Sequence, residues 1–171
     1  LACGGGDTAI ELAAIARRRK LNLSIKACDF NPEAVRIARR NVASSKSSVE
    51  VFVANALEPS EFEQFDVVYC TLFVHHLDPP DVVRLLKAMS SKARHLVIVD
   101  DLIRSRLGYL LAWIGTRLLS GSWVVHHDGP LSVKAAFTPT EILDLASQAG
   151  LSNCVMERTW PERYRLSWRP Y

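Results

Sequence analysis

The sequence predicts an α/β fold, a three-layer sandwich with a mostly parallel sheet and a C-terminal antiparallel hairpin. Short runs rich in β-branched residues alternate with helical patterns, which is typical of βαβ units with parallel strands. The four runs are 23–28, 49–54, 66–71 and 94–100. Two further runs, 152–159 and 163–169, flank Trp160-Pro161-Glu162 and predict the hairpin.

We expect a single domain over residues 1–171. A chain of 171 residues that is 49% hydrophobic and 23% charged suits one globular core, which excludes a disordered chain or a coiled coil. The net charge of +3 is far from the dense basic surface of a nucleic-acid binder. Only Leu1 and Ala2 precede the first turn, so we expect the N-terminal strand of the domain to be missing.

Cysteine usage favours a cytoplasmic protein without a metal site. Cys3, Cys28, Cys70 and Cys154 form no CxxC pair, so reduced thiols are expected. The most apolar stretch, 107–125, is interrupted by an arginine and by several Gly and Ser residues, which argues against a transmembrane helix. Nothing in the sequence determines an oligomeric state.

Capping residues followed by proline mark the helix starts. Asn31-Pro32 and Asp78-Pro79 each place a capping side chain before Pro at the first helical position. Thr138 and Glu141 form a capping box, and Gly150 ends that last helix. Parallel sheets bind ligands at the carboxyl ends of their strands, so the residues just after each strand are the candidates for a site.

A glycine-rich turn, Gly4-Gly5-Gly6, opens the first helix. Glycines let the main chain turn sharply and let a ligand approach it closely. Asp29 ends the next strand, at a spacing that suits hydrogen bonds from ribose hydroxyls, with helix capping as the alternative. Phe30 either covers an adenine ring or belongs to the core.

Two more strand ends carry candidate side chains. Asn55-Ala56 ends the third strand, where the amide suits an adenine edge and a plain turn is the alternative. Cys70-Thr71 ends the fourth strand. Because no basic partner is evident for Cys70, we expect a small buried thiol there rather than a nucleophile.

Together these motifs resemble class I S-adenosylmethionine-dependent methyltransferases of the small-molecule methyltransferase-domain type, which have a Rossmann-like fold. Residues 1–7 are similar to the family motif D-L-G-C-G-x-G, with Ala2 in place of the first glycine. Asp29 matches the acidic residue that closes the second strand, and Asn55-Ala56 stands where the family often has Asp-Ala. Residues 65–77 resemble the fourth strand with its "LHHL" segment, and the terminal hairpin also fits.

The resemblance implies S-adenosylmethionine as the cofactor, bound across the strand ends. It assigns cofactor binding to ten residues at these motifs: Ala2, Cys3, Gly4, Gly6, Asp29, Phe30, Asn55, Ala56, Cys70 and Thr71. The implied activity is methyl transfer to a small acceptor.

A general base is needed only when the acceptor must lose a proton. The candidates are His75, His76, His127 and Asp128. We select His76 and His127 as catalytic residues, with structural roles as the alternative for both.

Residues 104–137 form a long segment between the last strand of the parallel sheet and the last long helix. We interpret it as an inserted, lid-like segment. Five apolar side chains fall on one helical face: Leu107, Leu110, Leu111, Ile114 and Leu118. Three interpretations stay open, namely an apolar lid, a helix packed on the core, and shallow membrane contact helped by Trp113, Trp123 and Arg117.

Residues 123–130 are expected to form a polar turn. A lid of this kind suits an apolar or aromatic acceptor, with oxygen ahead of carbon as the accepting atom.

Two other function classes compete with methyl transfer. Gly4-x-Gly6-x-x-Ala9 with Asp29 also fits an NAD(P)-binding oxidoreductase, although the chain lacks room for a second, substrate domain. A non-catalytic cofactor-binding domain is the other alternative. Nucleic-acid acceptors are not supported. Residues 70–73 read Cys-Thr-Leu-Phe where base-directed amino methyltransferases usually have an Asn- or Asp-Pro-Pro-aromatic run, and Tyr69-Cys70 does not supply the Pro-Cys pair of RNA cytosine-C5 enzymes.

Overall fold

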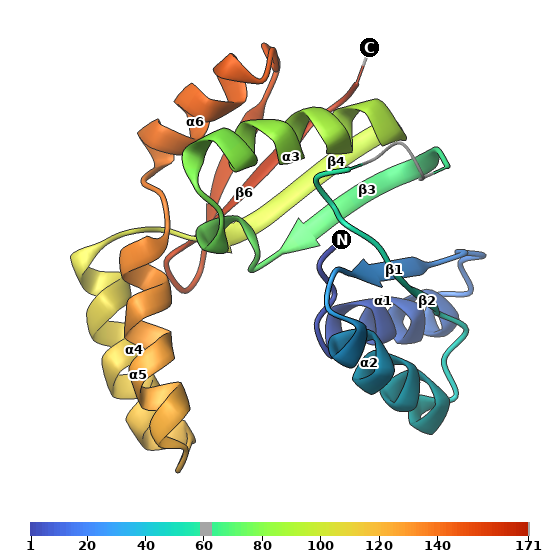
Figure 1. Cartoon of the computed structure of the whole chain (residues 1–171), viewed down its shortest axis with the longest axis horizontal. Helices are drawn as coiled ribbons and strands as arrows, with labels where there is room; N and C mark the ends of the chain where they lie inside the picture. Colours follow the sequence, from blue (N-terminus) through green and yellow to red (C-terminus); the bar gives the residue numbers. More distant parts are fainter. Residues whose placement is uncertain (59–62, 171) are drawn as a thin grey trace. The chain divides into compact units, whose positions relative to one another are not determined.

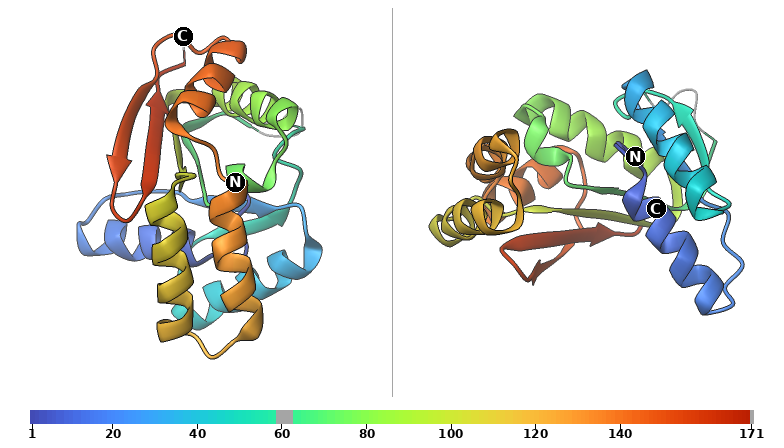
Figure 2. Two further views of the ribbon diagram at one scale, coloured as in Figure 1. Left: turned by 90° about the vertical axis from the view of Figure 1, so that its left-hand side faces the viewer. Right: turned by 90° about the horizontal axis from the view of Figure 1, so that it is seen from below.

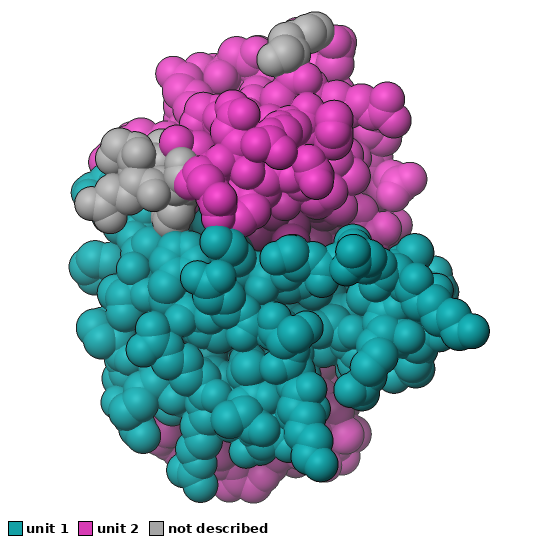
Figure 3. All heavy atoms as spheres, turned by 90° about the vertical axis from the view of Figure 1, so that its right-hand side faces the viewer, with its two compact units in different colours: residues 1–62 teal, residues 63–171 magenta. Residues whose placement is uncertain are grey.

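The computed structural model describes residues 1–58 and 63–170. Its internal contacts divide the chain into two compact units, residues 1–62 and 63–171, which are coloured separately in Figure 3. Both units combine helices with strands, and the α/β class predicted from the sequence is confirmed (Figure 1).

Unit 1 is a parallel strand pair covered by two helices. Its elements are α1 (Asp7–Arg18), β1 (Lys26–Asp29), α2 (Pro32–Ser45) and β2 (Glu50–Val53). The strands β1 and β2 pair in parallel register from Lys26–Glu50 to Asp29–Val53. Small and β-branched side chains form the buried core: Ala9, Ala27, Val35, Ala38, Val49 and Val51. The small alanines let the helices lie close to the short strands.

Unit 2 has a four-stranded sheet in the order β3-β4-β6-β5. Its strands are β3 (Phe65–Thr71), β4 (Ala93–Leu102), β5 (Val155–Thr159) and β6 (Arg163–Trp168). Its helices are η2 (Val74–His76, a 3-10 turn), α3 (Pro79–Lys92), α4 (Arg106–Leu119), α5 (Trp123–Ala135) and α6 (Pro139–Gln148). The pair β3–β4 is parallel, whereas β6 runs antiparallel to both β4 and β5, as expected for the terminal hairpin.

The core of unit 2 lies between α3 and the sheet. Leu85 and Leu86 of α3 are completely buried, as are Val97 and Val99 of β4 and Leu166 of β6. In β4 the buried side chains alternate with more exposed ones, which directs one face of the strand toward this core.

Capping follows the expectation at two helices and departs from it at a third. The Asn31 side chain accepts a hydrogen bond from Glu33 N (2.9 Å), and Thr138 forms its capping box with Glu141. Asp78 makes no side-chain cap at α3. Pro79 and Pro80 occupy the first two helical positions and have no N–H, and Asp81 N donates to the main-chain oxygen of Asp78 instead (2.9 Å).

The expected polar turn at residues 123–130 is wrong, because these residues belong to helix α5. Pro130 lies inside this helix and Gly129 precedes it, a pair that usually indicates a turn. A Cβ on Gly129 would lie 2.6 Å from Thr116 Cγ2 of α4. The glycine therefore serves the close packing of α4 against α5, which run antiparallel as a helical hairpin (Figure 2).

The amphipathic face of α4 does not pack on the core. Only Gly108 of α4 is buried, while Leu107, Leu110 and Leu118 are 49%, 51% and 79% exposed. The interpretation of α4 as a core helix is therefore wrong. Within the described ranges, no helix is both long enough and apolar enough to cross a membrane.

Candidate functional site

In unit 1 the glycine turn is hydrogen-bonded to the end of β1. Gly4 N donates to Asp29 Oδ2 (2.8 Å), and Cys3 N donates to the main-chain oxygen of Cys28 (2.9 Å). The other oxygen of Asp29 accepts from Asn31 N (3.0 Å) at the start of α2. The Asp29 carboxylate thus joins the glycine turn to the residue that begins the next helix.

The conformation of the turn explains its glycines. Gly6 has a φ of 81°, and a Cβ there would lie 3.2 Å from Ala38 Cβ, so a side chain would push α1 away from α2. Gly4 has a φ of 50° with no atom within 4 Å of its Cβ position, which leaves open space beside the main chain. Ala2 also has a φ of 50°. A residue other than glycine in this left-handed region typically costs about 1–2 kcal/mol.

The remaining candidates of unit 1 differ in exposure. Phe30 is 72% exposed and therefore lies outside the core. Asn55 Oδ1 accepts from Leu57 N (3.0 Å), which is the local turn geometry expected of an Asn after a strand. Ala56 is buried beside it. An exposed aromatic ring and an amide-bearing turn are thus available in this unit.

The thiols are poor nucleophiles in this structure. Cys70 is fully buried at the end of β3, with its Sγ 3.8 Å from Met89 Sδ. Burial raises its pKa to about 12, so the thiol stays protonated at neutral pH. The expectation of a small buried thiol is confirmed. Thr71, the next residue, is half-buried and reaches the end of the strand.

In unit 2 a buried carboxylate organises the turn that follows β3. Asp101 of β4 is 1% exposed, and its Oδ2 accepts from Phe73 N (2.9 Å) and Val74 N (2.7 Å). Its Oδ1 lies 2.6 Å from Nδ1 of His75, which is also buried. Because these groups donate to an acceptor-only carboxylate, Nδ1 of His75 carries the proton.

His76 lies exposed at the end of the same turn. Its ring centroid is 4.0 Å from that of His75. Partial burial lowers the pKa of His76, and the neighbouring His75 lowers it further. The neutral imidazole is therefore favoured at neutral pH, which leaves a nitrogen lone pair able to accept a proton.

Asp101 was not among the residues selected from the sequence. The usable signal was a pair of carboxylates, Asp100-Asp101, inside a strand that is otherwise apolar. Tyr164 of β6 lies opposite Asp101 in register, completely buried, and its hydroxyl has no hydrogen-bond partner among the described residues. Burial, reinforced by the charge of Asp101, raises the pKa of Tyr164 well above its ordinary value. The phenol therefore stays neutral beside the carboxylate.

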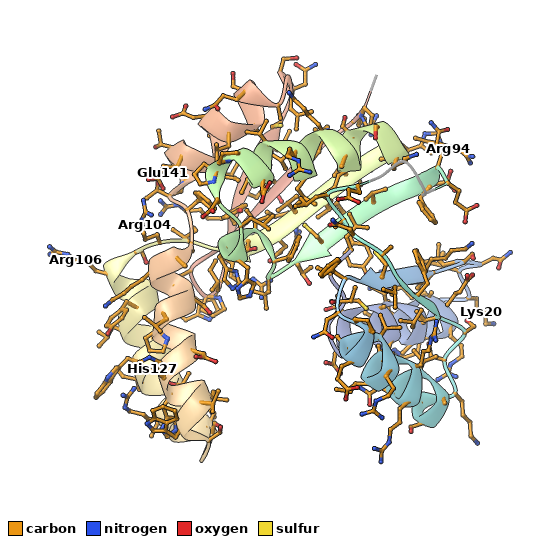
Figure 4. The ribbon with its side chains drawn as sticks, viewed as in Figure 1. Lys20, Arg94, Arg104, Arg106, His127 and Glu141 are labelled. Carbon is orange, nitrogen blue, oxygen red and sulfur yellow. The ribbon has the colours of Figure 1, made fainter. Side chains whose placement is uncertain are left out.

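His127 lies on the α4–α5 hairpin (Figure 4). It is exposed, and its ring stacks on that of Trp123 at 5.9 Å between centroids. Asp128 is its neighbour along a helix, where consecutive side chains point about 100° apart. Helix α5 also contacts η2 within unit 2, so the hairpin and the His75–His76 turn are neighbours.

The described part of the chain contains no group of three His, Cys, Asp or Glu side chains arranged to hold a metal. A shallow hollow of about 400 Å³ lies beside Lys87, Gly150 and Trp168. None of the predicted site residues lines it.

The comparison with protein families decides the family. A methyltransferase domain matches residues 1–95, which include the glycine turn, Asp29, and the His75–His76 turn. The chain belongs to the methyltransferase domain family. The resemblance inferred from the motifs is therefore confirmed. No curated protein matches the chain closely enough to add to this assignment.

Solved structures show that the methyltransferase domain has the expected fold. Magnesium protoporphyrin IX methyltransferase from Synechocystis PCC 6803, with bound SAH, has a TM-score of 0.67 and 15% identity over 99% of this chain and 72% of its own. LepI in complex with SAM has a TM-score of 0.69 and 16% identity, over 99% and 41%. A structure titled "A Pericyclic Reaction enzyme" gives the same values as LepI. The chain thus spans about two fifths of the length of two of these proteins.

Proposed function

We propose that this chain binds S-adenosylmethionine and transfers its methyl group to a small, apolar or aromatic acceptor, most readily at oxygen. The observation that carries the proposal is the hydrogen bond from Gly4 N to the Asp29 carboxylate. Both residues lie within the segment that matches the methyltransferase domain. The cofactor would supply an electrophilic methyl group on a sulfonium.

The residues of the glycine turn fit such a cofactor. Open space beside Gly4 admits a ligand to the main chain. Asp29 uses its carboxylate for two main-chain N–H groups, and a carboxylate has about four acceptor positions, so capacity remains for ribose hydroxyls. We assign the exposed ring of Phe30 and the turn at Asn55-Ala56 to the adenine. Ala2, Cys3 and Gly6 border the same turn, whereas Cys70 and Thr71 end β3 in the other unit.

We assign the general base to His76. Its lowered pKa keeps the ring neutral at neutral pH, and its neighbour His75 is held by the buried Asp101. Asp101 also holds two main-chain N–H groups of this turn, so the turn is organised before an acceptor arrives. Such preorganisation matters for methyl transfer, because the reaction depends mainly on placing the acceptor in line with the methyl group.

We place residues 104–137 at the acceptor site as its cover, since α5 contacts the η2 turn that carries His76. His127, on the exposed side of that hairpin, is the second candidate base. An apolar cover excludes water and favours an apolar or aromatic acceptor. A phenolic or enolic oxygen on such an acceptor would give its proton to a neutral imidazole during transfer.

Isothermal titration calorimetry with S-adenosylhomocysteine and, separately, with NAD tests the cofactor. We expect micromolar binding of the first and none of the second. Binding of NAD alone would instead favour the oxidoreductase interpretation of the glycine turn. Turnover is then measured with methyl-labelled S-adenosylmethionine against phenols, catechols and apolar enols. Cofactor binding without transfer to any of them would favour the non-catalytic cofactor-binding domain.

A further inference from the structure

The end of the α4–α5 hairpin carries a concentration of exposed apolar side chains. Leu118 and Leu119 close α4 at 79% and 89% exposure, and Trp123 opens α5 at 76%. Along α4, Leu107, Leu110 and Ile114 are 49%, 51% and 40% exposed on the same helical face. We call these six residues the hairpin apolar surface. Exposed apolar patches of this kind usually mark an interaction site.

The hairpin cannot bury this surface against itself. The helices α4 and α5 are already in close contact at Gly129 and Thr116, and the connection between them is ordered by local bonds. Ser122 N donates to Ser120 Oγ (3.1 Å), and the ring of His126 bonds the main-chain oxygen of Ser120 (2.6 Å). The two helices therefore leave no space between them in which these apolar side chains could be buried.

The charges around this surface are mostly positive. Residues 118–125 contain no charged side chain. Between residues 106 and 135 the cations are Arg106, Arg117 and Lys134, against the single carboxylate of Asp128. Arg117 lies next to the apolar end, with its guanidinium 4.1 Å from the centroid of the Trp113 ring. Figure 4 shows Arg106 at the opposite end of α4.

We propose that the hairpin apolar surface docks on an anionic phospholipid bilayer, with its side chains in the headgroup region. Tryptophan favours this depth, and an amphipathic helix lies in the interface with its apolar face toward the acyl chains. The cations, Arg117 above all, complement the anionic headgroups. None of the six residues of the hairpin apolar surface is assigned to cofactor binding, so this proposal goes beyond the proposed function and does not rest on the cofactor.

Vesicle co-sedimentation of the 171-residue chain tests the proposal. We compare phosphatidylcholine vesicles with vesicles that contain about 30% phosphatidylglycerol, at low and high salt. Binding is expected to the anionic vesicles and to weaken with salt. The same vesicles should shift the tryptophan emission to shorter wavelength, since Trp123 would leave water.

Variants locate the contact. The double variant Leu119→Ser with Trp123→Ser should bind anionic vesicles at least about tenfold more weakly, because it removes two large apolar side chains from the interface. Trp160→Ser is the matched control, since Trp160 is 79% exposed at the β5–β6 turn of the same unit. It should bind as the unmodified chain does. Arg117→Gln should weaken binding about fivefold for anionic vesicles only.

Circular dichroism and the melting temperature establish that each variant folds before its binding is compared. Absence of binding by the unmodified chain would overturn the proposal, as would equal binding by the double variant. Sedimentation velocity without lipid provides a further test. A dimer that the double variant dissociates would assign the hairpin apolar surface to self-association and would also overturn the proposal.

Discussion

Asp29 and Asp101 show how a single carboxylate organises main chain from different parts of the sequence. Asp29 bonds N–H groups of Gly4 and Asn31, and Asp101 bonds those of Phe73 and Val74. In both cases the carboxylate lies in the last residues of a strand and accepts from N–H groups of a turn elsewhere in the chain, the glycine turn for Asp29 and the turn after β3 for Asp101. Each side chain therefore has a structural role that its variants will report alongside any functional one.

Asp29→Ala should weaken the binding of S-adenosylhomocysteine. The variant removes a charged acceptor and frees the glycine turn, which we expect to cost about 1.5–3 kcal/mol of binding free energy. Calorimetry measures this, with Glu50→Ala as the control in the same unit, since Glu50 forms an exposed ion pair with Lys26. Unchanged affinity in Asp29→Ala would remove Asp29 from the cofactor site.

Asp101→Ala should destabilise the protein strongly. Four donors lose their acceptor in a buried place, and breaking a buried pair typically costs about 3–5 kcal/mol. Urea denaturation gives the free energy of unfolding. Asp66→Ala, which removes an exposed ion pair with Arg94, should cost at most about 1 kcal/mol. Similar losses in the two variants would contradict the role given to Asp101.

His76 predicts a pH dependence of stability. Its pKa is lowered in the folded protein, whereas an unfolded histidine titrates at about 6.5. Between these two values the unfolded chain binds more protons, so the free energy of unfolding falls as the pH falls below about 6.5. His76→Asn should reduce this acid sensitivity, as measured by urea denaturation across pH. An identical pH profile in the variant would show that His76 contributes nothing to it.

At the scale of elements, the α4–α5 hairpin depends on one close approach. Gly129→Ala places a Cβ 2.6 Å from the methyl group of Thr116, whose β-branched side chain has few other rotamers. We expect a loss of about 1–3 kcal/mol in the free energy of unfolding. Urea denaturation measures it, and Thr116→Ser, which deletes that methyl group, should restore part of the loss.

Gly115→Ala is the control for this prediction. Its Cβ would meet no atom within 4 Å, so only helix propensity acts. That variant should be more stable by up to about 1 kcal/mol. Equal effects at Gly115 and Gly129 would contradict the close packing of α4 on α5.

At the scale of the whole molecule, ligand binding should stabilise the folded chain by mass action. At about one hundred times its dissociation constant, S-adenosylhomocysteine should raise the free energy of unfolding by about 2.7 kcal/mol, because only the folded chain binds it. Denaturation with and without ligand measures this, and NAD at the same concentration should have no effect. Stabilisation by NAD alone would contradict the cofactor assignment.

The fold class and the family could be predicted from the sequence because their signals are local. Strand runs, Pro-marked helix starts and the glycine turn each occupy a few consecutive residues, and spacing alone relates Gly6 to Asp29. Local sequence signals gave a wrong secondary-structure prediction where two helices pack against each other. Gly129-Pro130 has the composition of a turn, yet contact with α4 places it inside a helix.

The sequence by itself determined the α/β elements, the terminal hairpin and the membership in the methyltransferase domain family. Only the tertiary structure decided that Asp101 lies against His75, 26 positions away, and that the apolar face of α4 stays exposed. Periodicity shows which side chains share a helix face, but not what covers that face. The buried hydrogen bond between His75 and Asp101 likewise depends on how β3 and β4 pair, which brings the turn after β3 beside the end of β4.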